Sequence, residues 1–183
     1  MEPFSTIVAA VDFSETSCDV VRAALVLARA GDGHVCLIHA VPHVIQTPWV
    51  VDASGLDVED LQRRWVSEAE EQLAGLAVAL RLDPRRVSAE VVVGPAAFEI
   101  VRHASERAAD VLVLGSHGRG VIRRFLLGGV AGRVLREATC PVLIVPDRAL
   151  TARSAGSRPG RDAALPGNPG ARSMSARLRV PAA

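Results

Sequence analysis

Five short segments rich in apolar residues recur along the chain, and a segment with helical character separates each from the next. The first reads TIVAAV, from Thr6 to Val11, and the others cover residues 34–41, 87–93, 110–114 and 142–145. Continuous apolar runs of this length are typical of strands buried on both faces of a parallel sheet. Their alternation with helices predicts an α/β fold in three layers, a doubly wound parallel five-stranded sheet with helices on both faces.

Helix signals fill the intervals between the runs. Ser14 is placed to cap the first helix, and Gly31 to end it. Pro95 suits the first turn of the third helix, because proline lacks the N–H that such a position leaves unpaired. The four helices are expected at about residues 14–30, 58–80, 95–108 and 128–137. A sheet of this kind binds ligands at the carboxyl ends of its strands, where the strand order reverses.

Charge divides the 183-residue chain into two parts that its formal net charge of +1 conceals. Residues 1–148 hold 15 Arg and 19 acidic residues, whereas residues 149–183 hold six Arg and one acid, with four each of Gly, Pro and Ser. The second part has no periodic apolar pattern with which to offset its ordering entropy. We therefore expect one domain over residues 1–148 and a disordered basic tail over 149–183.

Several classes of protein are excluded by composition. All 21 basic residues are Arg, so Schiff-base chemistry, the lysine-containing phosphate-binding loop and the protein-kinase lysine are absent. There is no Tyr and only 3% aromatic residues, which makes nucleic acid an unlikely partner. The three cysteines show no metal-site or disulfide spacing, and no apolar run reaches membrane length. These features predict a cytoplasmic protein that does not bind membranes.

Glycines are concentrated after the fourth predicted strand, at Gly115, Gly118, Gly120, Gly128 and Gly129. A glycine-rich loop between a strand and a helix lets the backbone N–H groups and the positive helix end converge on a phosphate. The alternative is a turn that needs glycine only for its own geometry. No third glycine completes a dinucleotide-binding fingerprint at the required spacing.

The region from about Phe4 to Pro146 resembles the universal stress protein family. The resemblance rests on five stretches, which are Ile7 to Ser17, Leu37 to Val41, Gly94 to Ala96, Ala109 to Gly120, and Cys140 to Pro146. It implies the fold of the adenine nucleotide alpha hydrolases. It also implies a cytoplasmic stress-response module that binds ATP or another adenine nucleotide, such as ADP, with Mg²⁺.

Nucleotide-binding members of that family carry a Gly-x2-Gly-x9-Gly-Ser/Thr pattern. Gly115, Gly118 and Gly128 match it, but Gly129 stands where the family has a hydroxyl, and Ala131 replaces a second one. The alternative is therefore a nucleotide-free dimeric interaction module of the same family. An enzyme that hydrolyses ATP or transfers its phosphoryl group is not expected, because no nucleophile–base pair can be identified in the sequence.

By the same resemblance, Asp12 contacts the ribose and the metal, while Ala10, Val11 and Ala40 line the adenine. Asp12 is instead a helix cap if the family role does not apply. His117 either touches phosphate or faces solvent, and His39 is expected to be a packed strand-end residue. The remaining predicted binding residues are Leu114, Gly115, Gly118, Arg119, Gly128, Gly129 and Val130. The last strand, Val142 to Val145, is expected to pair with its copy in a homodimer.

Overall fold

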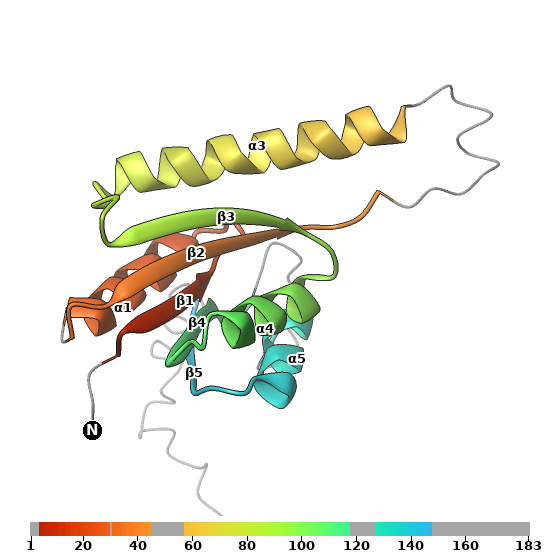
Figure 1. Cartoon of the computed structure of the whole chain (residues 1–183). Coiled ribbons are helices and arrows are strands. Elements are labelled where there is room, and N and C mark those ends of the chain that lie inside the picture. Colours follow the sequence, from red (N-terminus) through yellow and green to blue (C-terminus); the bar gives the residue numbers. More distant parts are fainter. Residues whose placement is uncertain (1–3, 30, 45–56, 118–126, 148–183) are drawn as a thin grey trace, which may run out of the picture.

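The computed structural model describes residues 4–29, 31–44, 57–117 and 127–147. All its strands belong to one parallel sheet in the order β3-β2-β1-β4-β5 (Figure 1). The chain proceeds outward from β1 to one edge and then returns to build the other, so the strand order reverses between β1 and β4. The strands are β1 (Thr6–Ala10), β2 (His34–Val41), β3 (Val87–Val93), β4 (Val111–Gly115) and β5 (Val142–Val145).

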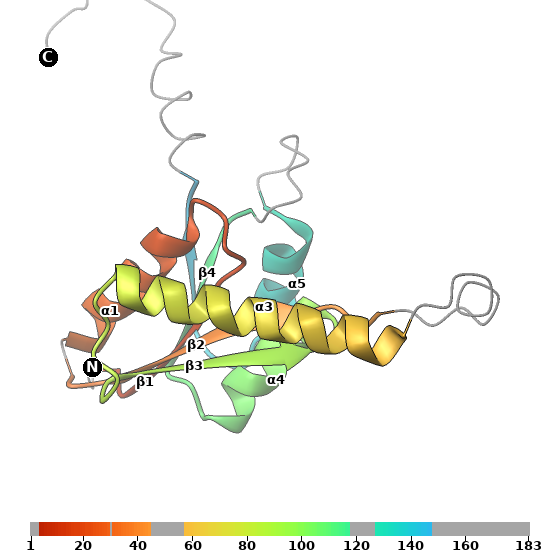
Figure 2. The ribbon, with the colours of Figure 1, turned by 90° about the horizontal axis from the view of Figure 1, so that it is seen from above.

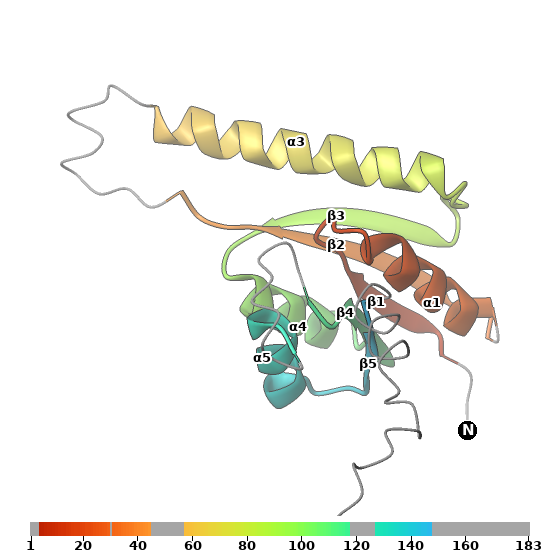
Figure 3. The same cartoon turned by 180° about the vertical axis from the view of Figure 1, so that it is seen from behind.

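Helices cover both faces of the sheet. Two of them, α1 (Ser17–Arg29) and α3 (Val58–Ala79), lie on one face. The other two, α4 (Ala96–Glu106) and α5 (Gly129–Glu137), lie side by side on the opposite face (Figures 1 and 3). The prediction of a three-layer, doubly wound parallel sheet is confirmed.

Successive side chains of a strand point to opposite faces of the sheet, so the core consists of two clusters, one on each face. In β1, Ile7 and Ala9 pack with α1 and α3, whereas Val8 and Ala10 pack with α4 and α5. Ile7, Val8 and Ala9 are fully buried. Full burial of a valine or isoleucine side chain, such as Val8 or Ile7, contributes about 1.5–3 kcal/mol. This explains why the central strand has a continuous apolar sequence, with no polar face.

Helix α3 packs on the sheet through only a small part of its surface. Of its 22 residues only Ala69 and Leu73 are buried. Its N-terminal end reaches past the sheet (Figure 2), and Trp65 is 38% exposed. Asp57 caps this helix, because its side chain accepts a hydrogen bond from the Asp60 N–H. The long helix was predicted correctly, and both of its buried residues lie in its C-terminal half.

The start of α1 differs from the prediction. The helix begins at Ser17, three residues after the expected cap at Ser14. The Ser14 hydroxyl donates to Asp12 Oδ1 at 2.6 Å, and the Ser14 N–H donates to the same oxygen at 3.1 Å. Ser14 therefore stabilises the turn that precedes the helix, and its prediction as the helix cap was wrong.

The remaining sequence predictions about the chain concern its thiols, membrane segments and tail. Cys36 is buried and Cys18 and Cys140 are half-buried, all as free thiols, and burial raises the pKa of the Cys140 thiol. Among the helices of the described ranges, none is both long and apolar enough to cross a membrane. Residues 148–183 lie outside the described residues, so the boundary at 148 and the disorder of the tail stay predictions.

Candidate functional site

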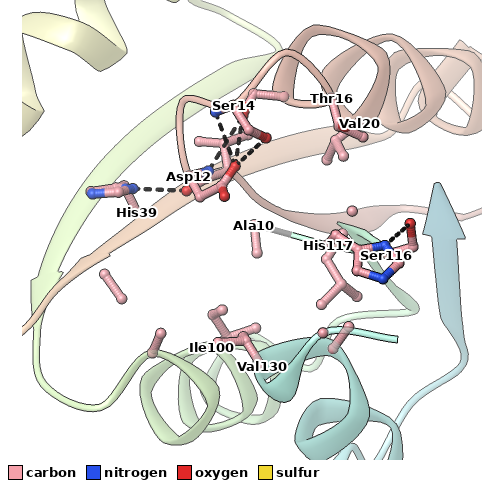
Figure 4. A pocket seen from close by; sticks show the side chains of 18 of the residues that line it. Ala10, Asp12, Ser14, Thr16, Val20, His39, Ile100, Ser116, His117 and Val130 are labelled. Atoms are coloured by element: carbon pink, nitrogen blue, oxygen red, sulfur yellow. Dashed lines mark hydrogen bonds between the residues drawn. The ribbon is translucent and has the colours of Figure 1, made fainter. Parts of the chain in front are cut away.

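A cavity of about 710 Å³ opens at the carboxyl edge of the sheet, beside the ends of β1 and β4 (Figure 4). This is the point where the strand order reverses, as expected for a ligand site in such a fold. The volume lies within the range of small-molecule sites. Gly118 and Arg119 lie outside the described residues, and every other predicted site residue lines this cavity. These are Ala10, Val11, Asp12, Ala40, Leu114, Gly115, His117, Gly128, Gly129 and Val130.

Three helices begin at the wall of this cavity. The first residue of each lines it: Ser17 of α1, Ala96 of α4 and Gly129 of α5. The first N–H groups of a helix have no partner within the helix, and they carry the positive end of its dipole. Gly128, the N-cap of α5, has no side chain with which to cap these groups. The arrangement therefore favours an anion in the cavity.

The Asp12 carboxylate is held in a fixed orientation at the cavity wall. Its Oδ1 accepts hydrogen bonds from the N–H and hydroxyl of Ser14 and from the Ser17 hydroxyl, the last at 3.2 Å. The Ser14 N–H lies in the turn that precedes α1, so through these bonds the Asp12 carboxylate stabilises this turn. The carboxylate thus lies beside the first turn of α1, within the same cavity as the glycines.

Hydrogen bonds of Ser116 connect the two ends of the glycine-rich loop. Its carbonyl accepts the Gly128 N–H at 2.7 Å, and its own N–H donates to the Val145 carbonyl at 2.8 Å. Its hydroxyl lies 3.1 Å from His117 Nδ1 and accepts the Asp147 N–H at 3.3 Å. The loop therefore starts and ends at fixed points beside the cavity, joined to the end of β5.

The described glycines of the loop have different reasons to be glycine. A Cβ on Gly115 would lie 3.3 Å from the His117 carbonyl oxygen and 3.4 Å from Thr16 Cγ2, which is tight packing. Around Gly129 a Cβ would meet nothing within 4 Å. A side chain at 115 would therefore require a small shift of the His117 carbonyl, whereas at 129 there is room for a side chain.

Sequence reasoning missed one wall of the cavity. Ile100 of α4 lies across the cavity from Asp12 (Figure 4), and Ala96 of the same helix also lines the cavity. The Gly94-Pro95 pair just before Ala96 was the available signal. Other lining residues outside the predicted set are Ser14, Thr16, Ser17, Val20, His39, Pro42, Ser116, Leu127 and Ala131.

Residues 3–146 match the universal stress protein family. The chain belongs to this family. Universal stress protein G of Escherichia coli O157:H7 is 34% identical over 144 residues, covering 78% of this chain and 99% of that protein. Universal stress protein A homolog 2 of Coxiella burnetii is 35% identical over 127 residues, covering 69% of this chain and 83% of that protein.

Two solved universal stress protein structures with bound nucleotides resemble the fold. The universal stress protein of Archaeoglobus fulgidus in complex with dAMP has a TM-score of 0.56 and 26% identity, covering 78% of this chain and 98% of that one. A universal stress protein in complex with cAMP has a TM-score of 0.51 and 25% identity, covering 79% and 98%. Nucleotides are thus bound by other members of the universal stress protein family.

Proposed function

We propose that this universal stress protein is a cytoplasmic regulatory module that binds ATP or another adenine nucleotide with Mg²⁺. The observation that carries the proposal is the convergence of three helix N-termini and the Asp12 carboxylate on one cavity at the strand-order reversal. Positive helix ends suit phosphates, and an apolar wall suits an adenine ring. The relatives in complex with dAMP and cAMP favour an adenine nucleotide.

Each group of the ligand has a candidate partner. Ala10, Val11 and Ala40 lie at the ends of β1 and β2, where the family resemblance assigns the adenine. The phosphates would lie against the N–H groups of Gly129 and Val130 at the start of α5. These backbone donors are present whatever the side chain at position 129, so the missing hydroxyl weakens the proposed site without removing it.

Asp12 fits a magnesium ion that is shared with the ligand. Mg²⁺ is commonly held by one or two carboxylates together with substrate phosphates. In the part of the chain that the structure describes, no three His, Cys, Asp or Glu side chains are grouped as a metal site. When bound, the ion neutralises phosphate charge, and this chain contributes the oriented Asp12 carboxylate.

The second candidate is a nucleotide-free dimeric interaction module of the same family. It is favoured by Gly129 and Ala131, which provide no hydroxyl at the phosphate end of the cavity. The proposed homodimer forms through β5, which lies at a sheet edge with Leu143 39% exposed. A further alternative, an ATP-hydrolysing or phosphoryl-transferring enzyme, has no residue in an identified catalytic role.

The nucleotide content of freshly purified protein distinguishes the three functions. Acid extraction followed by anion-exchange chromatography is expected to release ATP at a substantial fraction of one per chain, and little from Asp12→Ala. ADP that accumulates with turnover of added ATP would indicate the enzyme. Absence of nucleotide, with no binding on addition of ATP and Mg²⁺, would favour the interaction module and contradict the proposal.

A further inference from the structure

The turn after β1 has an unusual backbone conformation. Phe13, directly after Asp12, has a φ of 60°, in the left-handed region that non-glycine residues rarely occupy. Such a conformation persists only where the surrounding structure enforces it, and it is concentrated at functional sites. The side chains that hold this turn therefore also determine where Asp12 lies.

His39 of β2 contacts the turn on both sides of Asp12. Its Nδ1 lies 2.8 Å from the Val11 carbonyl oxygen (Figure 4), and its ring centroid lies 4.3 Å from that of Phe13. A carbonyl oxygen only accepts hydrogen bonds, so Nδ1 carries the proton and donates. His39 thus fixes the residue before Asp12 by a hydrogen bond and the residue after it by ring packing.

The parallel register of β1 and β2 makes this contact possible. Ala10 is paired with Ile38, and the Val11 N–H donates to the Ile38 carbonyl at 2.9 Å. His39 is therefore the first residue of β2 after the last one that pairs with β1, and it lies level with the start of the turn. His39 is half-buried, and it is among the residues that line the cavity described above.

We propose that His39 is a positioning residue of the nucleotide site, and this inference rests on the proposed function. By holding Val11 and Phe13, His39 keeps the turn in the conformation that presents Asp12 to the ribose and metal end of the ligand. Its contribution to affinity passes through Asp12. The sequence prediction of His39 as a packed strand-end residue is extended here to a role in binding.

A double-mutant cycle separates this role from general packing. Affinity for ATP with Mg²⁺ is measured by calorimetry for wild type, His39→Leu, Asp12→Ala and the double variant. Loss of one hydrogen bond that orients the site predicts about fivefold weaker binding for His39→Leu. In the Asp12→Ala background the same substitution is expected to change affinity by less than about twofold.

Two further variants control for folding and for chemistry. His39→Asn keeps an N–H donor near the Nδ1 position, and it is expected to bind within about twofold of wild type. His34→Leu makes the same change as His39→Leu at the exposed first position of β2, where His34 contacts Ser88. It is expected to bind as wild type does. If His39→Leu fails to fold, the comparison of His39→Asn with His39→Gln, whose longer side chain displaces the donor, provides the same test.

The possible results distinguish failure of the positioning role of His39 from failure of the proposed nucleotide-binding function. Wild-type affinity in His39→Leu, or an equal loss in the Asp12→Ala background, would overturn the positioning role while nucleotide binding stands. If wild-type protein binds no nucleotide, the proposed function and this inference both fail.

Discussion

The substitution Gly129→Ser restores a hydroxyl at the first residue of α5. Gly129 lines the cavity, and a Cβ there would meet nothing within 4 Å, so a serine side chain fits without displacing a neighbour. The N-cap before it, Gly128, is extended, with φ −65° and ψ 161°. A serine side chain at the first helical position would therefore lie beside the N–H groups that are proposed to bind phosphate.

The expected gain in affinity for ATP is modest. One added hydrogen bond contributes about 0.5–1.5 kcal/mol net of exchange with water, so a gain of about 1 kcal/mol is expected. That corresponds to about fivefold tighter binding of ATP. Serine also has a higher helix propensity than glycine by about 0.5 kcal/mol, so the unliganded protein is expected to melt slightly higher.

Calorimetric titration with ATP and Mg²⁺ measures the change in affinity, and Gly132→Ser is the matched control. Gly132 lies on the same helix but does not line the cavity, and a Cβ there would lie 3.7 Å from Arg136 Nη1, an ordinary contact. Both variants are expected to melt slightly higher, but only Gly129→Ser is expected to bind more tightly. Equal affinity of wild type and Gly129→Ser would refute a phosphate seat at the start of α5.

Three further predictions address the rest of the molecule. Leu143→Arg places a charge on the exposed position of the edge strand β5 and is expected to convert a wild-type dimer into a monomer, measured by light scattering; a monomeric wild type would contradict the interface. Hydrogen bonds from the Thr6 and Ser5 N–H groups lower the pKa of Asp110, so the ionised carboxylate stabilises the fold above the ordinary carboxyl pKa, and this stabilisation is lost as pH falls through the lowered pKa. Below about pH 4 the melting temperature of wild type should therefore fall more steeply with pH than that of Asp110→Asn. Parallel plots of melting temperature against pH for the two proteins would refute this. Truncation after Asp147 is expected to leave the melting temperature within a few degrees in calorimetric scans, whereas a large drop would show that residues 148–183 pack on the domain.

The fold was predictable because β1, β2 and β4 are largely buried and have nearly continuous apolar sequences. The expectation of burial on both faces was wrong for the edge strands β3 and β5, whose residues are mostly exposed or half-buried because each has a neighbouring strand on one side only. Runs such as Ile7 to Ala10 have no polar face, and their short length favours a strand over a buried helix. Element ends were less predictable. Ser14 has the chemistry of a helix cap, yet its hydroxyl bonds to Asp12, and a sequence does not show which of two nearby polar partners prevails.

Site residues that directly end or follow a strand were predictable, whereas those brought to the site by packing between elements were not. Asp12 follows the end of β1 and Gly115 is the last residue of β4, so strand polarity alone brings them to one edge. The contact of His39 with Val11 requires the register of β1 against β2, and the wall formed by Ile100 requires the rotation of α4 about its axis. Neither quantity is encoded in a local pattern of residues.

Calorimetric titration of the wild-type chain with ATP in the presence of Mg²⁺ tests the central claim most directly. The cavity at the strand-order reversal, with its three helix N-termini and Asp12, predicts saturable heat at millimolar or lower ATP and a higher melting temperature at saturation. Absence of both heat and thermal shift at millimolar ATP would contradict nucleotide binding at this cavity.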